Sequence, residues 1–404
     1  MTGVQTCALP ISRNEDWHFT SVTPIAERTF RAPKAPAAHT PAEILGLVTG
    51  NAAWPRAVFV NGRFDAALSS LGGLDGAKVA TLSAALRDMP DFVATHLGKL
   101  ATFDRQAFTA FNTAFAQDGL VVRVPKGVKV AAPLHVIHVA DAQAAGSMLH
   151  PRLLVVVEPL AEFAVVESFV ALKGTEYLTN AVAEVFVGNG ARVHHYKVQQ
   201  EARDAFHVGT VQATQGRDSL FHSFSYAAGA ALSRTNIYTK LLGEAAEVRL
   251  NGLYLLDGSQ HADHQTFVEH IAPACASREL YKGVLDGEAH GVFNGKVFVD
   301  PEAQKTDGKQ TNHALLLSPA ARIDTKPQLE IFADDVKCTH GATVGRLDEM
   351  ALFYLKSRGV GAENARALLT YAFAAEVLET VELDALREGL EAIAFRRFTH
   401  QDQR

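Results

Sequence analysis

Apolar positions along the chain change their period twice, near residue 119 and near residue 345. In the first part, three phenylalanines recur at helical spacing, at Phe108, Phe111 and Phe115. Further upstream, residues 40–43 (TPAE) combine an N-cap threonine, a proline at the first helical position and a glutamate placed for a capping box. We therefore expect residues 12–118 to form an N-terminal helical domain.

Between residues 119 and 345 the apolar positions alternate as they do in β-strands. A short pattern recurs just after turns: a small residue, any residue, then an apolar one. It occurs at Ala161/Phe163, Ala191/Val193, Ser219/Phe221, Ala246/Val248, Gly291/Phe293 and Ala321/Ile323. The separations are about 27 to 30 residues, with one gap of about 45, and a period of this size is typical of repeat architectures.

Helical patterns are absent between these strands, which argues against βαβ units. We therefore predict a mainly β fold, a parallel β-helix or related solenoid over residues 119–345. Within one strand, alternation places five residues inward (Val248, Leu250, Gly252, Tyr254 and Leu256) and three outward (Glu247, Arg249 and Asn251). A β-sandwich is the structural alternative, and it predicts tighter and more even strand spacing.

The helical period returns after residue 345. Asp348 is placed to cap a helix that ends at Gly359. Apolar residues at helical spacing predict two more helices, one around residues 365–373 and one around residues 383–393. Residues 346–404 are thus expected to form a C-terminal helical domain. Since a solenoid needs covered ends to stay soluble, we expect the terminal helical domains to cap it.

Composition narrows the class of protein. The chain has 404 residues, of which 48% are hydrophobic and 20% are charged, so it can bury a substantial core. A net charge of −6 argues against nucleic acid as the main partner. Three widely spaced cysteines indicate a reducing compartment and no disulfide framework. No apolar run approaches the roughly 20 residues of a membrane span, so we expect a soluble, cytoplasmic protein.

The first eleven residues, MTGVQTCALPI, need separate treatment. They lack the basic start and the long apolar stretch of a secretory signal. They look like the in-frame translation of a sequencing adapter. On this interpretation residues 1–11 are an artefact, Cys7 is not native, and the native chain begins near Ser12.

Cys338 and His340 are the candidate metal ligands, and they lie in a stretch whose sequence is typical of β-strands. If the stretch is extended, the two side chains point to the same face. A thiol and an imidazole together suit Fe, Zn or Cu(I) better than Mg or Ca, but such sites usually take about four ligands. Either another chain supplies the rest or the pair is not a metal site. The adjacent Lys337 is expected to favour the thiolate form of Cys338.

Other cysteine and histidine positions favour structural roles. Cys275 follows three histidines, His261, His264 and His270, at a spacing that matches no standard metal motif. His194 and His195 are neighbours on a predicted strand, so they point to opposite faces and cannot both bind one ion.

Long motifs then resemble a known family. QKTDGKQTN, TKPQLEI, ADDVKC and HGATVG between residues 304 and 345, SRELYKGVL at 277–285, FYLKSRG at 353–359 and NEDWHFT at 14–20 are similar to the SufB/SufD family of the SUF iron–sulfur cluster assembly machinery. The resemblance covers essentially the whole chain after residue 11. SufB-type members carry HEAT where this chain has residues 340–343 (HGAT), which favours the SufD type.

The resemblance implies a right-handed parallel β-helix flanked by N-terminal and C-terminal helical domains. It implies pairing with SufB through the β-helices, binding of the ATPase SufC by the C-terminal helical domain, and a homodimer in isolation. Cys338 and His340 become candidate ligands of a transient iron–sulfur cluster shared with SufB, with a reduced flavin as a candidate electron donor in the complex. Tyr354 and Arg358 are candidate contacts for SufC.

The chain has no GxxxxGK[ST] motif, so we expect it to bind no nucleotide and to act as a non-catalytic subunit. The alternative is a stand-alone β-helix enzyme acting on a carbohydrate. Many such enzymes line a groove with acidic residues, and Asp300, Asp334 and Asp335 are candidates for one.

Overall fold

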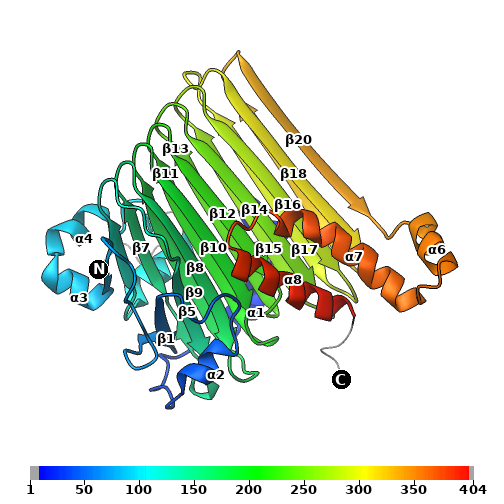
Figure 1. The fold of residues 1–404 in the computed structure, drawn as a ribbon, viewed down its shortest axis with the longest axis horizontal. Helices are drawn as coiled ribbons and strands as arrows, with labels where there is room; N and C mark the ends of the chain where they lie inside the picture. Colours follow the sequence, from blue (N-terminus) through cyan, green and yellow to red (C-terminus); the bar gives the residue numbers. More distant parts are fainter. Residues whose placement is uncertain (1–8, 105, 400–404) are drawn as a thin grey trace.

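The fold is a parallel β-helix built from two ten-stranded sheets (Figure 1). In this computed structural model, residues 9–104 and 106–399 are described. From β8 onward, consecutive strands lie alternately in one sheet and in the other, so that two strands make one coil. The prediction of a β-helix is confirmed and the β-sandwich alternative is wrong, because all pairs between neighbouring coils are parallel.

We call the two sheets the even sheet and the odd sheet, after the strand numbers that they contain from β8 onward. The even sheet contains β2 (Arg63–Phe64), β1 (Arg56–Val60), β5 (Leu134–Ala140), β8 (Glu162–Ala171), β10 (Arg192–Gln200), β12 (Leu220–Ala227), β14 (Glu247–Leu256), β16 (Ala276–Leu285), β18 (Thr306–Leu316) and β20 (Val336–Gly345). The odd sheet contains β19 (Arg322–Ile331), β17 (His290–Val299), β15 (His261–His270), β13 (Leu232–Leu241), β11 (Phe206–Gln215), β9 (Leu178–Val187), β7 (Arg152–Val157), β4 (Leu120–Val124) and β3 (Lys78–Thr81), with β6 (Met148–Leu149) beside β9.

Small residues stack one above another just before the strands of the even sheet. The register of the strands aligns Ala161, Ala191, Ser219 and Ala246 with Cys275. The gap of about 45 residues in the sequence pattern arises because that series passes from the even sheet at 246 to the odd sheet at 291. Cys275 therefore occupies a position in the repeat that requires a small side chain.

The inward and outward assignment for β14 is confirmed in its main part. The side chains of Val248, Leu250, Tyr254 and Leu256 lie in the central core between the sheets. Asn251 is on the outer face as expected but is nevertheless buried, and it lies 3.2 Å from His222 Nε2. This part of the outer face is buried because helices cover it.

The region before residue 119 contains helices and also strands that the sequence pattern did not predict. The helices are η2 (Glu15–Trp17), α1 (Thr23–Ala26), α2 (Pro41–Leu45), α3 (Leu82–Asp88), α4 (Pro90–His96) and α5 (Ala107–Phe115). The capping box at Thr40 and Glu43 is present. β1 extends the even sheet and is buried on both sides, so its residues form a continuous apolar run without alternation. Residues 1–8, including Cys7, lie outside the described residues.

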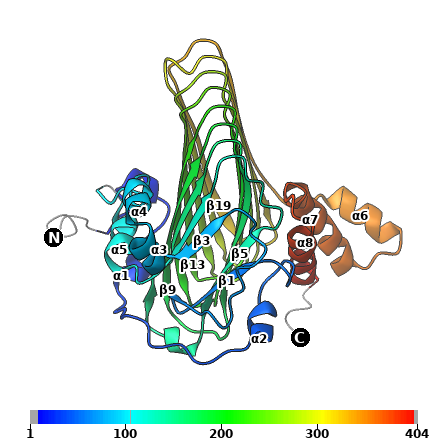
Figure 2. The same ribbon diagram turned by 60° about the vertical axis from the view of Figure 1, so that its left-hand side comes forward.

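Two of the three C-terminal helices cover one side of the β-helix, the third lies farther out (Figure 2), and the last strand is left exposed. The three helices are α6 (Glu349–Ser357), α7 (Ala362–Leu378) and α8 (Asp384–Phe398). One further short helix, the 3-10 helix η3 (Ala142–Ala144), lies between β5 and β6. Asp348 caps α6 and Gly359 follows it with φ +86°, as predicted. The expectation that this domain caps the solenoid is wrong. α7 and α8 instead bury apolar side chains against the outer faces of β10, β12, β14 and β16.

None of the helices in residues 9–104 and 106–399 has the length and hydropathy needed to cross a membrane.

Candidate functional site

The last coil of the β-helix forms an open end. β20 ends the even sheet and β19 ends the odd sheet, and each pairs with only one neighbour among the described strands. Large apolar side chains are exposed here at Ile331, Phe332 and Val344. Unpaired edge strands with exposed apolar side chains are templates for pairing with another chain. We call this surface, formed by β19, β20 and their connecting turn, the open end.

Cys338 lies on β20 with its side chain facing the core. It is half-buried, packs against the central apolar cluster and lies opposite Gly308 of β18. A Cβ atom at Gly308 would lie 3.3 Å from the sulfur, so the glycine leaves room for the thiol. Burial raises the pKa of Cys338, and the charge of Asp307 acts in the same direction. The expectation that Lys337 favours the thiolate is therefore wrong for the isolated chain, since adjacent strand residues point to opposite faces.

His340 lies two residues further along β20 and, by strand alternation, on the same face as Cys338. Its side chain is exposed because no further coil covers it. In register beneath it lies Gln310, which donates a hydrogen bond from Nε2 to Glu279 of the coil below (3.1 Å). The structure thus places the predicted pair together at the open end, above a buried polar column that runs from Gln310 to Glu279.

This column was not predicted from the sequence, although the spacing that indicates it is simple. Gln310 and His340 are 30 residues apart and Glu279 lies 31 residues before Gln310. Those separations are close to the coil length inferred from the repeats. Once the coil length is known, inward residues separated by one coil are expected to stack.

Glu279 makes the stability of the coil beneath the site dependent on pH. Burial raises the pKa of Glu279 to about 7, against hydrogen bonds from Thr266 and Gln310 that lower it. The folded chain thus retains a proton that the unfolded chain, with a pKa near 4.5, releases. Stability conferred by this group is present below about pH 4.5 and is lost as the pH rises to about 7.

Glu279→Gln is therefore expected to stabilise the protein at pH 8 by up to about 3 kcal/mol and to have little effect at pH 4.5. The amide stays neutral at both values. Urea unfolding of both proteins across this pH range measures the difference. Glu302→Gln, an exposed carboxyl in a turn near the same end, is the control. A difference between Glu279→Gln and the parent chain that does not grow with pH would contradict the prediction.

The other cysteine and histidine candidates do not form one site. Cys275 is fully buried in the central core, its sulfur lies 3.3 Å from the carbonyl oxygen of Gly243, and burial raises its pKa. His264 is buried and stacks on Tyr254. His270 Nε2 lies 2.9 Å from Ser277 Oγ, and His261 Nδ1 lies 3.0 Å from His290 Nδ1.

The acidic candidates lie in turns. Asp300 follows β17, and Asp334 and Asp335 lie between β19 and β20. The carbonyl oxygen of Asp335 accepts a hydrogen bond from the amide of Lys305, which holds successive turns together. No contact described for these three carboxylates favours a carbohydrate-cleaving site.

Helix α6 projects away from the rest of the molecule (Figure 1). None of its residues is buried, and Met350, Phe353 and Tyr354 expose most of their surface. The guanidinium of Arg358 lies 5.2 Å from the ring centroid of Tyr354. Tyr354 and Arg358 therefore lie side by side on an exposed, partly apolar surface.

Comparisons with known proteins place the chain in a family. A family model described as "SUF system FeS cluster assembly, SufBD core domain" matches residues 138–373, and one described as "SufBD protein N-terminal region" matches residues 2–136. The chain belongs to the SufBD family of iron–sulfur cluster assembly proteins.

Within that family the chain is a homologue of SufD. It is 32% identical to the iron–sulfur cluster assembly protein SufD of Escherichia coli over 95% of this chain and 88% of that protein. It is 35% identical to an iron–sulfur cluster assembly SufBD family protein of Synechocystis over 95% of this chain and 86% of that protein. SufD of Bacillus subtilis is 28% identical over 73% of this chain and 67% of that protein. The resemblance found in the sequence motifs is confirmed.

Proposed function

We propose that this chain is a non-catalytic subunit of a SUF complex, in which it pairs with a SufB-type subunit to form the site of cluster assembly and binds a SufC-type ATPase. The single observation that carries the proposal is the open end, where the predicted pair Cys338 and His340 lies on an unpaired edge strand. A pair of ligands at an unpaired edge is the expected half of a site that a second chain completes.

The edge at β20 favours the addition of a partner strand. β20 has ten residues and no proline, so each residue has a backbone amide that can donate. β19 contains Pro327, which has no amide hydrogen, so the edge of β19 offers fewer hydrogen-bond donors to an added strand. The SufB-type subunit is therefore proposed to extend the even sheet at β20, and to cover Phe332 and Val344.

Covering the open end changes the chemistry of the pair. The nascent iron–sulfur cluster is cargo, and it needs ligands that hold it and at least one that exchanges readily. His340 is exposed on the isolated chain and is proposed as that exchangeable ligand. Cys338 lies deeper, above Gly308, and its raised pKa keeps the thiol protonated until a cation or the partner's charge compensates.

The second proposed partner surface is helix α6. Its exposed Met350, Phe353 and Tyr354 form an apolar patch that nothing in the described residues covers. We assign this patch, with Tyr354 and Arg358, to the SufC-type ATPase.

ATP hydrolysis belongs to that partner, and a reduced flavin belongs to the complex as a candidate electron donor. A cytoplasmic location stays a prediction.

Cluster yield tests the shared site. The chain is co-expressed with the SufB-type and SufC-type subunits of the same genome, and iron and sulfide are measured in the purified complex. His340→Ala is expected to lower the yield by about tenfold or more, because it removes a ligand. Cys338→Ala is expected to lower it less, by about twofold to threefold, because its thiol is protonated and half-buried.

Lys337→Ala and Thr339→Ala are matched controls, since they lie on the same strand with side chains on the opposite face. Both are expected to keep the parent yield. Full yield in His340→Ala and Cys338→Ala, with the three-subunit complex intact, would rule out the shared site. Loss of the complex itself would point to pairing and not to cluster ligation.

A further inference from the structure

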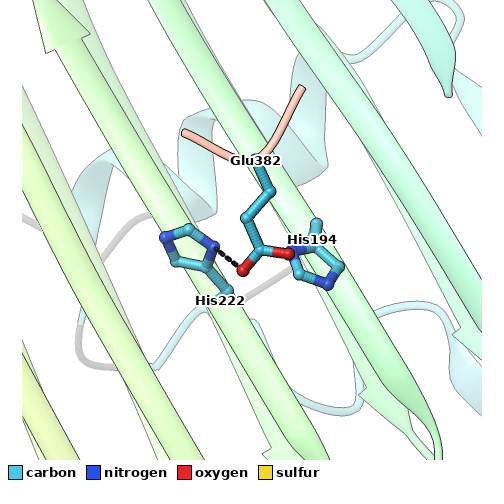
Figure 3. Close-up of side chains that lie close together, drawn as sticks. All are labelled: His194, His222 and Glu382. Carbon is cyan, nitrogen blue, oxygen red and sulfur yellow. Dashed lines mark ion pairs between the residues drawn. The ribbon is translucent and has the colours of Figure 1, made fainter. Parts of the chain in front are cut away.

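Three potential metal ligands meet on the outer face of the even sheet, away from the open end. They are His194 on β10, His222 on β12 and Glu382 in the connection between α7 and α8 (Figure 3). The two histidines are direct neighbours, because the register of β10 and β12 pairs His194 with His222. The carboxylate of Glu382 lies between the two imidazole rings.

The spacing of the ligand atoms suits a bound ion better than direct hydrogen bonds. Glu382 Oε2 lies 3.7 Å from His194 Nδ1, and Glu382 Oε1 lies 3.8 Å from His222 Nδ1. Hydrogen bonds between such groups are shorter, at about 2.7–3.2 Å. Ligands bound to Zn²⁺ at about 2.0–2.2 Å in a tetrahedron lie about 3.3–3.6 Å apart. All the ligand atoms are within 4.8 Å of one another, so small side-chain movements close the site.

The two imidazole nitrogens are buried without hydrogen-bond partners. This holds for Nδ1 of His194 and Nδ1 of His222 among the described residues. A buried polar atom without a partner carries a cost, and binding of an ion removes it.

Neighbouring groups hold the ligands in place. Asn251 Nδ2 lies 3.2 Å from His222 Nε2 and holds the ring in place. An ion on Nδ1 requires this amide to rotate by about 180°, so that its oxygen accepts the Nε2 proton and the Nδ1 lone pair is free. The backbone amide of Glu382 donates to the hydroxyl of Tyr196 at 3.3 Å, which fixes the helix connection over the two histidines. Such outer contacts are typical of metal sites.

Arg249 opposes a cation at this position. Its guanidinium lies 3.9 Å from Glu382 Oε1, although a closer contact of 2.7 Å pairs it with Glu247. An ionic contact of Glu382 with Arg249 alone is the simpler role for the cluster. It does not account for two unpartnered imidazole nitrogens aimed at the same carboxylate.

We propose that His194, His222 and Glu382 bind a divalent transition-metal ion of the zinc class, with water as the fourth ligand, and that this ion fastens the α7–α8 connection to the β-helix. Two imidazoles and one carboxylate are a known ligand set for zinc. The site is separate from the cluster-assembly pair, since it lies on the side of the solenoid under the C-terminal helices.

Zinc titration of the purified full-length chain tests the proposal. The experiment uses a Cys338→Ala, His340→Ala background, so that the open end contributes no ligands. One Zn²⁺ per chain is expected, and Zn²⁺ is expected to raise the melting temperature. Co²⁺ is expected to give the absorption of a tetrahedral site.

Glu382→Gln is expected to weaken Zn²⁺ binding by about tenfold or more and to abolish the rise in melting temperature. His222→Ala is expected to do the same, but its ring is buried, so the exposed Glu382 is the decisive variant. Glu379→Gln, an exposed carboxylate near the end of α7, is the matched control and is expected to bind Zn²⁺ as the background does. Equal Zn²⁺ affinity in Glu382→Gln and Glu379→Gln would overturn the proposal. The proposal would also be overturned if the Cys338→Ala, His340→Ala background bound no Zn²⁺ and Glu382→Gln only lowered its stability. The role of Glu382 would then be an ionic contact alone.

Discussion

A chain that carries Phe332→Glu and Val344→Glu is expected to lose binding to the SufB-type subunit by about a hundredfold or more. The two side chains are 60% and 50% exposed in the free chain, so the changes should leave the fold intact. In the proposed complex both positions are covered, and a charge buried without a partner costs several kcal/mol. Each 1.4 kcal/mol corresponds to a factor of ten in affinity. Size-exclusion chromatography and titration of the mixed subunits measure the loss.

The matched control introduces the same two charges elsewhere. Leu86→Glu and Leu242→Glu replace apolar side chains that are 52% and 54% exposed and lie away from the open end. That variant is expected to bind the SufB-type subunit as the parent chain does. If both double variants bind equally well, the open end is not the pairing surface. If both fail to bind, net charge and not position governs pairing.

The coils of the β-helix were predictable because their signal repeats. Strand alternation identified the inward residues of β14, and the period of small residues identified the coil length. Two features were not predicted. Strand β16 was missing from the series because Ser277 stands at the apolar position that Val248 occupies in β14, and β1 was missing because a strand buried on both faces does not alternate.

The candidate site was predictable only in its local part. Strand alternation placed Cys338 and His340 on one face, and this prediction needs only the positions of the two residues within a single strand. Whether that face is covered depends on where residues 346–399 pack, and their helical period does not contain this information. The sequence therefore predicted capped ends, whereas α7 and α8 cover the outer face of the even sheet.

The histidine cluster was missed for a related reason. His194 and its sequence neighbour His195 point to opposite faces, as predicted: His194 faces Glu382 and His195 lies in the interior against Glu167. The partner of His194 is His222, 28 residues away in the next coil. Pairs across coils become visible only when the register is known.

Glu184→Ala is expected to cause the largest loss of stability, about 3–5 kcal/mol. Glu184 is a single acidic residue in the apolar strand β9, and it is fully buried with its carboxylate against Arg152 of β7. The same carboxylate accepts backbone hydrogen bonds from Gly98, Leu100 and Ala101 at 2.7–3.1 Å. Removal of the carboxylate leaves the buried guanidinium without a counter-charge, although it still donates to Asn112 and Thr113, and it leaves three amides unpaired. Urea unfolding and hydrogen exchange measure the loss, and exchange is expected to rise first at residues 98–101.

Two comparisons separate this mechanism from a general loss of charge pairs. Glu162→Ala breaks the exposed pair with Lys129 and is expected to cost no more than about 1 kcal/mol. Arg152→Met combined with Glu184→Leu removes both charges and is expected to recover part of the stability, because no buried charge is left without a partner. The three amides remain unpaired in that variant, so recovery stays incomplete. A Glu184→Ala chain as stable as Glu162→Ala would show that the residues 98–101 rearrange without cost, and that the ion pair does not hold the N-terminal region to the β-helix.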